Sequence, residues 1–486
     1  MTAPSQNAPE PPALLSFPPA TRQDWLALVE ASLKGAPLDR LRSKTADGIV
    51  VEPLYRDRED APRLDARPAP ALDPEQPWDL RAIIAHPDPA RAAEQALEAL
   101  ENGGGSLLLR IDPQGRDGVV VHDQDSLARA LSGVLLDAAP VALDAGLLGP
   151  QAADWLAVLG KGAPAARLGF HMDPLSAFAE QGASPGPIAA HVGAAAQTAA
   201  RHAGAYPKAT FFLASGRVAH EAGGSDGQEL GFLAAAALAY AKAGVEAGLS
   251  MAQAFQGIVL GLSLDQTYLE GVAKLRAARA IWSRLAGACG VELPARIEAR
   301  SSRRMLSKLD PWSNLLRLTA AGFAGGVGGA DAVALEPFTA PLGAPTAFAR
   351  RQSRNIQLIL MQEASLGRVA DPAGGAWYLE QLTDDLARAG WAFFQAIEQQ
   401  GGPIAALESG FVADALARTR AERPAVPIVG ASQFRATDQA PVATEPLEPR
   451  PESRSVEARQ PGDDSRCPPL APIRFSAPFE EEAASA

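Results

Sequence analysis

The sequence predicts an α/β protein in which helices cover a parallel β-sheet. From about residue 104 to residue 340, short apolar runs alternate with helical stretches, which is the order of repeated strand–helix units. We count about seven of these runs, close to the eight strands of a (β/α)8 barrel. Periodicity alone does not separate such a barrel from a doubly wound sheet, so the pattern leaves both architectures open.

The seven runs share a short length and a high content of apolar residues. They are residues 106–111, 141–144, 167–171, 210–214, 257–262, 295–299 and 332–335. The clearest helix between them carries Leu269, Val272, Arg276, Arg279 and Trp282 at helical spacing. A further amphipathic helix is expected at residues 381–400, after the last strand.

The chain on either side of these units has a different composition. Residues 1–16 are polar and rich in proline, and we expect them to be disordered. Residues 17–103 form an N-terminal extension, with a helix that begins after Thr21, a suitable N-cap residue. Residues 104–430 hold the strand–helix units and the helices that follow them. Residues 431–486 are rich in Pro, Glu, Arg and Ser, which predicts a flexible tail.

Bulk composition limits the possible functions. The chain has 486 residues and a hydrophobic content of 47%, enough for a real core. Its net charge of −12 argues against a general nucleic-acid binder. We expect no transmembrane helix, because no run of about 18 apolar residues occurs, and no signal peptide. Two cysteines far apart in sequence fit a reducing cytoplasm, where we expect the protein to be located.

Several short motifs come close to known catalytic or ligand-binding patterns but fail at a key residue. His220-Glu221 begins a zinc-protease motif, but the second histidine position holds Gly224. Residues 261–265 miss the nucleophile elbow because Asp265 replaces its last glycine. The glycine-rich residues 322–329 lack the Lys-Ser/Thr of a phosphate loop, and a helix end with a turn is the better interpretation. The six histidines show no metal-ligand spacing, so no metal site is predicted.

Longer motifs, taken together, resemble the methylmalonyl-CoA mutase family, a group of adenosylcobalamin-dependent isomerases. Residues 353–357 and 370–377 are similar to segments of the family's substrate-binding barrel. Further similar stretches, in the family's order, are residues 52–55, 77–81, 215–216, 221–223, 268–282 and 310–314. The resemblance covers residues 17 to about 430 and implies a (β/α)8 TIM-type barrel. Residues 17–21 and 33–37 are typical of the small-subunit branch of the family.

The resemblance also identifies positions where catalytic residues are replaced. In catalytic chains of the family, a tyrosine that presses on the cofactor stands where this chain has Ile83. A histidine that hydrogen-bonds the thioester carbonyl, and so stabilises charge on that oxygen, stands where this chain has Val218. We therefore expect no catalytic residue and no cofactor-binding residue in this chain.

The family's substrate pocket is changed as well. A segment rich in Ser, Thr, Gln and Gly in catalytic chains is here Arg300-Ser301-Ser302-Arg303-Arg304. Arg303 and Arg304 are expected to fill or charge a pocket meant for coenzyme A, although they could contact phosphates. Arg81 and His220 are the other candidates for substrate binding, and His220 lies two residues beyond Val218. These changes argue against productive binding of a CoA ester.

The resemblance implies that adenosylcobalamin binds elsewhere. Cobalamin-binding chains of the family carry Asp-x-His-x-x-Gly, whose histidine ligates cobalt, and this motif does not occur here. Residues 475–480 resemble the lead-in to the cobalamin-binding domain. We therefore expect that domain to be lost or encoded separately.

These features predict the non-catalytic small (β) subunit of the mutase, a pseudo-enzyme that forms a heterodimer with a large catalytic subunit. The large subunit would bind adenosylcobalamin and convert methylmalonyl-CoA to succinyl-CoA, an isomerase step of propionate metabolism. Two alternatives stay open: an active acyl-CoA mutase barrel that uses a separate cobalamin-binding chain, or a CoA-ester-binding regulatory module. We expect neither nucleic acid nor a membrane among the partners.

Overall fold

The computed structural model describes residues 20–56, 76–163, 165–424, 426–435, 440–447 and 456–485. The expected disorder of residues 1–16 lies outside this range. The chain divides into two compact units, Met1–Tyr55 and Arg56–Ala486. No helix in the described part is long and apolar enough to cross a membrane. Both cysteines, Cys289 and Cys467, are free thiols.

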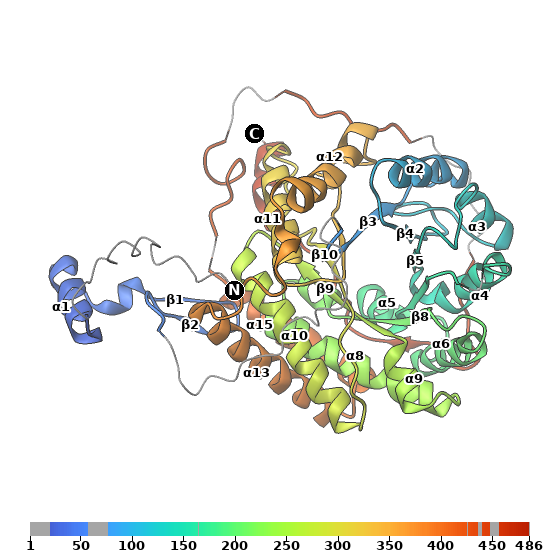
Figure 1. Ribbon diagram of the computed structural model, residues 1–486, viewed down its shortest axis with the longest axis horizontal. Helices are drawn as coiled ribbons and strands as arrows, with labels where there is room; N and C mark the ends of the chain where they lie inside the picture. The colour runs from blue at the N-terminus through green and yellow to red at the C-terminus, as the bar shows by residue number, and fades with distance from the viewer. Residues whose placement is uncertain are drawn as a thin grey trace, which may run out of the picture. The chain divides into compact units, whose positions relative to one another are not determined.

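The second unit is built around a closed barrel of eight parallel strands, which confirms the barrel and excludes the doubly wound sheet (Figure 1). Every neighbouring pair of barrel strands is parallel, and β9 returns to β10 to close the ring. In chain order the barrel strands are β3 (Asp79–Ile84), β4 (Ser106–Arg110), β5 (Val141–Asp144), β6 (Leu168–Met172), β8 (Thr210–Ser215), β9 (Ile258–Leu264), β10 (Ile297–Ser301) and β11 (Ala332–Ala334).

The barrel begins earlier in the chain than the predicted boundary at residue 104. Its first strand, β3, lies inside the segment 17–103 and pairs with β4 on one side and β11 on the other. The sequence did not single out this strand because Asp79 and Arg81 interrupt its apolar pattern. All seven strand candidates correspond to barrel strands, so only this first strand was missed.

Helices surround the barrel (Figure 1). Those that follow the first five strands are α2 (Pro89–Glu101), α3 (Gln124–Ala130), α4 (Gly149–Leu159), α5 (Pro174–Gln181), α6 (Ile188–Ala203), α7 (Arg217–Glu221), α8 (Asp226–Glu246) and α9 (Met251–Gln256). Those that follow the last three are α10 (Tyr268–Ala288), α11 (Ser313–Val327), α12 (Ala347–Leu358), α13 (Trp377–Gln399), α14 (Pro403–Glu408) and α15 (Phe411–Glu422). The expected helices at 269–282 and 381–400 are α10 and α13.

The helices α8, α10 and α13 pack against one another on one side of the barrel (Figure 1). Two glycines permit the close approach of α8 and α13. A Cβ added at Gly231 would lie 2.8 Å from the carbonyl oxygen of Gly390, and one at Gly390 would lie 2.7 Å from Leu230 Cβ. Real Cβ contacts are longer than this, so both positions require glycine if the two helices are to keep their spacing.

The first unit has no core of its own. Its helix α1 (Arg22–Leu33) begins as expected, because the Thr21 side chain accepts from the Asp24 backbone N–H in a capping box. A short 3₁₀ helix (Leu38–Leu41) and a hairpin of β1 (Ser43–Lys44) and β2 (Val50–Val51) complete it. None of the described residues 20–55 is buried, and Leu28 on α1 is 70% exposed.

The described part of the C-terminal segment, residues 456–485, is a structured strap, which corrects the predicted flexible tail for these residues. Its strand β12 (Ser465–Arg466) pairs with β7 (Ala183–Ser184), and its helix α16 spans Ala477–Ser485. Backbone N–H groups of the strap donate to carbonyl oxygens of Ala179, Gly182, Glu221 and Arg304. Composition missed this order because backbone hydrogen bonds to the barrel, and a few buried side chains such as Leu470, hold the segment.

Candidate functional site

Charged side chains from four strands meet inside the barrel. Arg300 on β10 is only 1% exposed; its Nε lies 2.6 Å from Glu298 Oε1, and its Nη1 pairs with Asp144 on β5. Arg81 on β3 pairs with Glu298 and, at 2.8 Å, with Asp79 on its own strand. His171 on β6 approaches the same Glu298 carboxylate at 3.5 Å. We call Arg81, Asp144, His171, Glu298 and Arg300 the axial network.

The electrostatics of the axial network keep its acids and arginines charged. Burial raises the pKa of Glu298, but the charges of Arg300 and Arg81 outweigh it and hold that pKa well below its usual range. Burial likewise opposes the charge of Arg300, and Glu298 and Asp144 together raise its pKa above the ordinary value. His171 is different, since burial dominates and lowers its pKa to about 4, so it is neutral at pH 7.

The axial network lies between two cavities at opposite ends of the barrel. The cavity at the N-terminal ends of the strands has about 650 Å³ and is lined in part by Arg81, His171 and Glu298. The cavity at the C-terminal ends has about 290 Å³ and is lined in part by Asp144, His171 and Arg300. Paired side chains of the axial network therefore lie between the two cavities.

A second group of ion pairs lies at the C-terminal mouth of the barrel. Arg303 Nε is 2.9 Å from Glu336 Oε1, and Arg303 also pairs with Asp117. Arg110 Nη2 reaches the same Glu336 oxygen at 2.6 Å. These residues line a third cavity of about 440 Å³, together with Ile83 and the strap residue Arg474. Arg303 thus places a paired charge at the mouth of the barrel.

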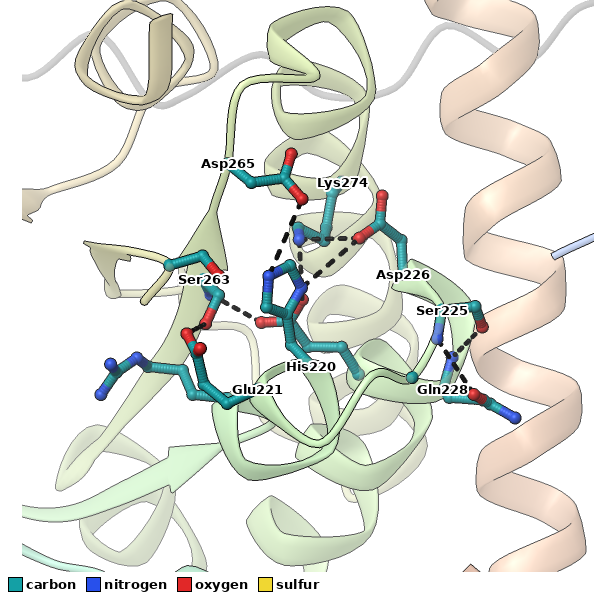
Figure 2. Close-up of polar contacts among 12 residues, drawn as sticks. His220, Glu221, Ser225, Asp226, Gln228, Ser263, Asp265 and Lys274 are labelled. Carbon is teal, nitrogen blue, oxygen red and sulfur yellow. Dashed lines mark hydrogen bonds and ion pairs between the residues drawn. The ribbon is translucent and has the colours of Figure 1, made fainter. Parts of the chain in front are cut away.

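A third charged cluster lies around His220, between α7, α8 and α10 (Figure 2). Nδ1 of the fully buried His220 is 3.1 Å from Glu229 Oε2. Lys274 Nζ lies 2.8 Å from Asp226 Oδ1 and 2.7 Å from Glu229 Oε2. His220, Asp226 and Glu229 could hold a metal ion by their spacing, but the Lys274 ammonium already bonds both carboxylates. Lys274 is therefore the cation that these two carboxylates share, and the absence of a metal site stays a prediction.

The structure separates the residues that the sequence grouped as site candidates. Ile83 lines the mouth cavity and Val218, on α7, lines the C-terminal cavity. His220 does not share the face of Val218, because both lie on one helical turn and His220 points into its own ion cluster (Figure 2). Arg81 belongs to the axial network instead of a substrate pocket.

Arg304 also has a role that the sequence did not suggest. It is 3% exposed and donates to the carbonyl oxygens of His220 and Gly224 at 2.7 and 2.9 Å. Its guanidinium lies over the ring of Phe475 at 5.1 Å, so it holds the strap. Arg304 is therefore not placed to contact a ligand, which corrects its candidacy.

Sequence reasoning missed the two residues that fill the barrel, Glu298 and Arg300. Glu298 lies in the strand candidate 295–299 and Arg300 directly follows it, and residues two apart on a strand share one face, so this alternation was the available signal. In an otherwise apolar strand, two charged residues on one face indicate a polar lining of the barrel interior.

The fold and these sites define a (β/α)8 barrel whose axis is occupied by ion-paired side chains. Residues 75–461 match the family model described as methylmalonyl-CoA mutase. The chain therefore belongs to the methylmalonyl-CoA mutase family.

Its similar relatives place it in the small-subunit branch. The methylmalonyl-CoA mutase small subunit of Streptomyces virginiae is 39% identical over 463 residues, which covers 90% of this chain and 74% of the relative. The small subunit of Propionibacterium freudenreichii subsp. shermanii is 32% identical over 90% of this chain and 72% of its own length. A probable small subunit of Mycobacterium tuberculosis is 36% identical over 80% of this chain and 65% of its own length.

We predict that the substitution Arg300→Gln lowers the free energy of unfolding by about 3–5 kcal/mol, because it removes one of the two arginine partners of the buried Glu298 and the ion-pair partner of the part-exposed Asp144. Urea unfolding, monitored by circular dichroism, measures this change in the free energy of unfolding. The matched control is Arg388→Gln, which removes an exposed i,i+4 pair on α13 and should change stability by less than about 0.5 kcal/mol. A loss below about 1 kcal/mol at Arg300 would contradict the axial network.

The His220 cluster predicts a specific acid sensitivity. Burial raises the pKa of Glu229, but Lys274 outweighs it and lowers the pKa to about 2 from an ordinary 4.5. A depressed folded-state pKa contributes stability above pH 4.5 that is lost as the pH falls towards 2. Glu229→Gln should therefore show a shallower fall in unfolding free energy between these pH values than the unmodified chain. The exposed control Glu94→Gln should keep the full slope; equal slopes for all three proteins would refute the assignment.

Proposed function

We propose that this chain is the non-catalytic partner in a methylmalonyl-CoA mutase heterodimer. In this proposal a large subunit binds adenosylcobalamin and isomerises methylmalonyl-CoA to succinyl-CoA, and the present chain supports it in the cytoplasm. The axial network carries the proposal. Arg300, Glu298 and Arg81 are paired with one another inside the barrel, which supports the proposal that no CoA ester reaches its C-terminal end along the axis.

The residues at the C-terminal mouth support the same conclusion. Ile83 and Val218 line the cavities there, and neither side chain can donate a hydrogen bond or transfer a proton. Among the polar groups at the mouth, Arg303 is paired with Glu336 and Asp117. This end therefore supplies no donor aimed at a substrate carbonyl at the positions where the family resemblance predicts one.

The same mouth does not fit adenosylcobalamin. A corrin ring needs a broad open face, whereas strap residues Leu470 and Pro472 line the C-terminal cavity and Ile473 lines the mouth cavity beside it. The cavities there hold about 290 and 440 Å³, each partly enclosed by charged pairs. These observations support the proposal that the cofactor belongs to the partner subunit.

The unit Met1–Tyr55 supports a role in assembly. It carries a helix and a hairpin, yet none of its described residues is buried. Secondary structure without a core is not stable alone, so the unit needs a surface on which to bury residues such as Leu28 and the half-buried Trp25. A partner subunit that buries this arm would also stabilise the chain by mass action.

Co-expression with the catalytic mutase chain of the same genome, followed by size-exclusion chromatography with light scattering, tests the proposal. We expect a stable one-to-one complex with mutase activity. Deletion of residues 1–55 should weaken the complex at least about tenfold, which corresponds to about 1.4 kcal/mol of binding free energy. The deletion should leave the melting temperature of the isolated chain unchanged, because none of the described residues 20–55 is buried. A lone monomer or homodimer of the full chain would contradict the proposed role.

A further inference from the structure

One stretch of the strap forms a wall of two cavities. Leu470 and Pro472 line the cavity at the C-terminal ends of the barrel strands, and Pro472, Ile473 and Arg474 line the mouth cavity beside it. Both cavities lie at the end of the barrel where (β/α)8 proteins place their functional loops. The position of this stretch therefore affects how widely both cavities open to solvent.

The backbone of this stretch has few attachments to the rest of the chain. Within residues 467–476, the N–H groups that donate to carbonyl oxygens outside the strap belong to Cys467, Leu470, Ile473 and Phe475. The residues at positions 468, 469 and 472 are prolines, which have no N–H to donate. The same prolines restrict the backbone, so we expect the stretch to move as one piece.

The buried side chains of this stretch are also few. Of residues 467–476, only Cys467, Leu470 and Ser476 are buried. Segments with few buried contacts can open locally while the rest of a protein stays folded. Burial and backbone bonding thus both indicate a low local stability for residues 467–476.

Phe475 anchors this stretch between two arginines. Its ring centroid lies 5.1 Å from the guanidinium carbon of Arg304 and 5.3 Å from that of Arg423. Both guanidiniums are also held by groups outside the strap. Arg304 pairs with Asp265 at 3.1 Å, and Arg423 donates to the Gly224 carbonyl oxygen at 3.1 Å. Phe475 can therefore leave its place without breaking these two contacts of the barrel.

We propose that residues 467–476 form a lid that opens and closes while the barrel stays folded, with Phe475 as its anchor, and that this movement controls access to the two cavities. The flanks of the lid have attachments of their own. On one side β12 pairs with β7, and on the other Glu480 of α16 accepts from the Lys308 backbone N–H at 3.0 Å. The proposal does not depend on the heterodimer, because it concerns only this chain's own strap.

Cys467 is a reporter of lid opening that the chain already contains. Its side chain is buried at the start of the lid, and its Sγ lies 3.6 Å from the Phe178 carbonyl oxygen. Burial raises the pKa of this thiol to about 11, so almost no thiolate is present at neutral pH while the lid is closed. A thiol reagent should therefore label Cys467 in the open state.

The experiment uses the full chain with Cys289→Ser, so that Cys467 is its single thiol. Labelling by a disulfide reagent gives the opening constant of the lid, and hydrogen exchange gives that of the barrel strands β4 and β10. We expect the lid to open with a constant at least about a hundredfold larger. Phe475→Ala should speed labelling at least about tenfold and leave the melting temperature unchanged.

Two control variants separate the anchor from a general effect of aromatic residues. Phe475→Tyr keeps an aromatic ring between Arg304 and Arg423, so it should label at the rate of the parent chain. Phe434→Ala removes a side chain that is 81% exposed and lies outside the lid, so it should also leave the rate unchanged.

A second reporter tests whether the lid controls access to the cavity. Val218 lines the cavity at the C-terminal ends of the strands and is 8% exposed. In a chain whose two native cysteines are replaced by serine, the substitution Val218→Cys places a thiol there. Phe475→Ala should speed the labelling of this thiol by a factor similar to that for Cys467.

Three results would overturn the proposal. An opening constant of Cys467 equal to that of the barrel strands would mean that the strap opens only when the chain unfolds. If Phe475→Ala leaves labelling unchanged, or lowers the melting temperature and the protection of the strands together, Phe475 does not anchor a separate lid. Equal labelling of Val218→Cys with and without Phe475→Ala would show that cavity access does not depend on the lid. Hydrogen exchange at the Ile473 and Phe475 amides checks lid opening in the unmodified chain.

Discussion

The pairing of Arg300 with Glu298 and Asp144 is the constraint on which the rest of this molecule depends. A closed parallel barrel brings β10 within reach of β3, β5 and β6, so a charged residue on its inner face must find partners across the axis. Buried ion pairs add little net stability compared with apolar packing. The consequence of this network is therefore where it lies: its paired side chains sit inside the barrel between the two end cavities.

Because ion-paired side chains lie along the axis, the surfaces that this chain can offer to a partner lie on the outside of the barrel. The strap lies over the C-terminal ends of the strands, held by Arg304, Phe475 and backbone hydrogen bonds. The N-terminal unit carries secondary structure without burying any described residue. These two features support the proposal that the chain acts by supporting a partner chain.

The sequence predicted the barrel well and the site poorly, for identifiable reasons. Apolar runs identified seven of the barrel strands. The remaining strand, β3, was missed because Arg81, a charged residue that points inward, interrupts the apolar pattern that indicates a strand. Motif resemblance located Ile83 and Val218, which do lie at the C-terminal end. Motif resemblance could not identify Arg300 as a residue that lies across the barrel axis. The pairing of side chains across a barrel depends on which strands face one another. Composition likewise missed the strap, whose order comes from contacts with distant residues.

The strongest rival to this account is a CoA-ester-binding module. Arg167, Lys208 and Arg296 line the cavity at the N-terminal end of the barrel, where phosphates could be held without entering the axis. Isothermal titration of the isolated chain with methylmalonyl-CoA and succinyl-CoA separates the two accounts most directly. The proposed supporting role predicts no saturable binding up to about millimolar ligand, a free energy weaker than about −4 kcal/mol. Stoichiometric binding at micromolar concentration would contradict the central claim that this chain supports its partner without binding the substrate.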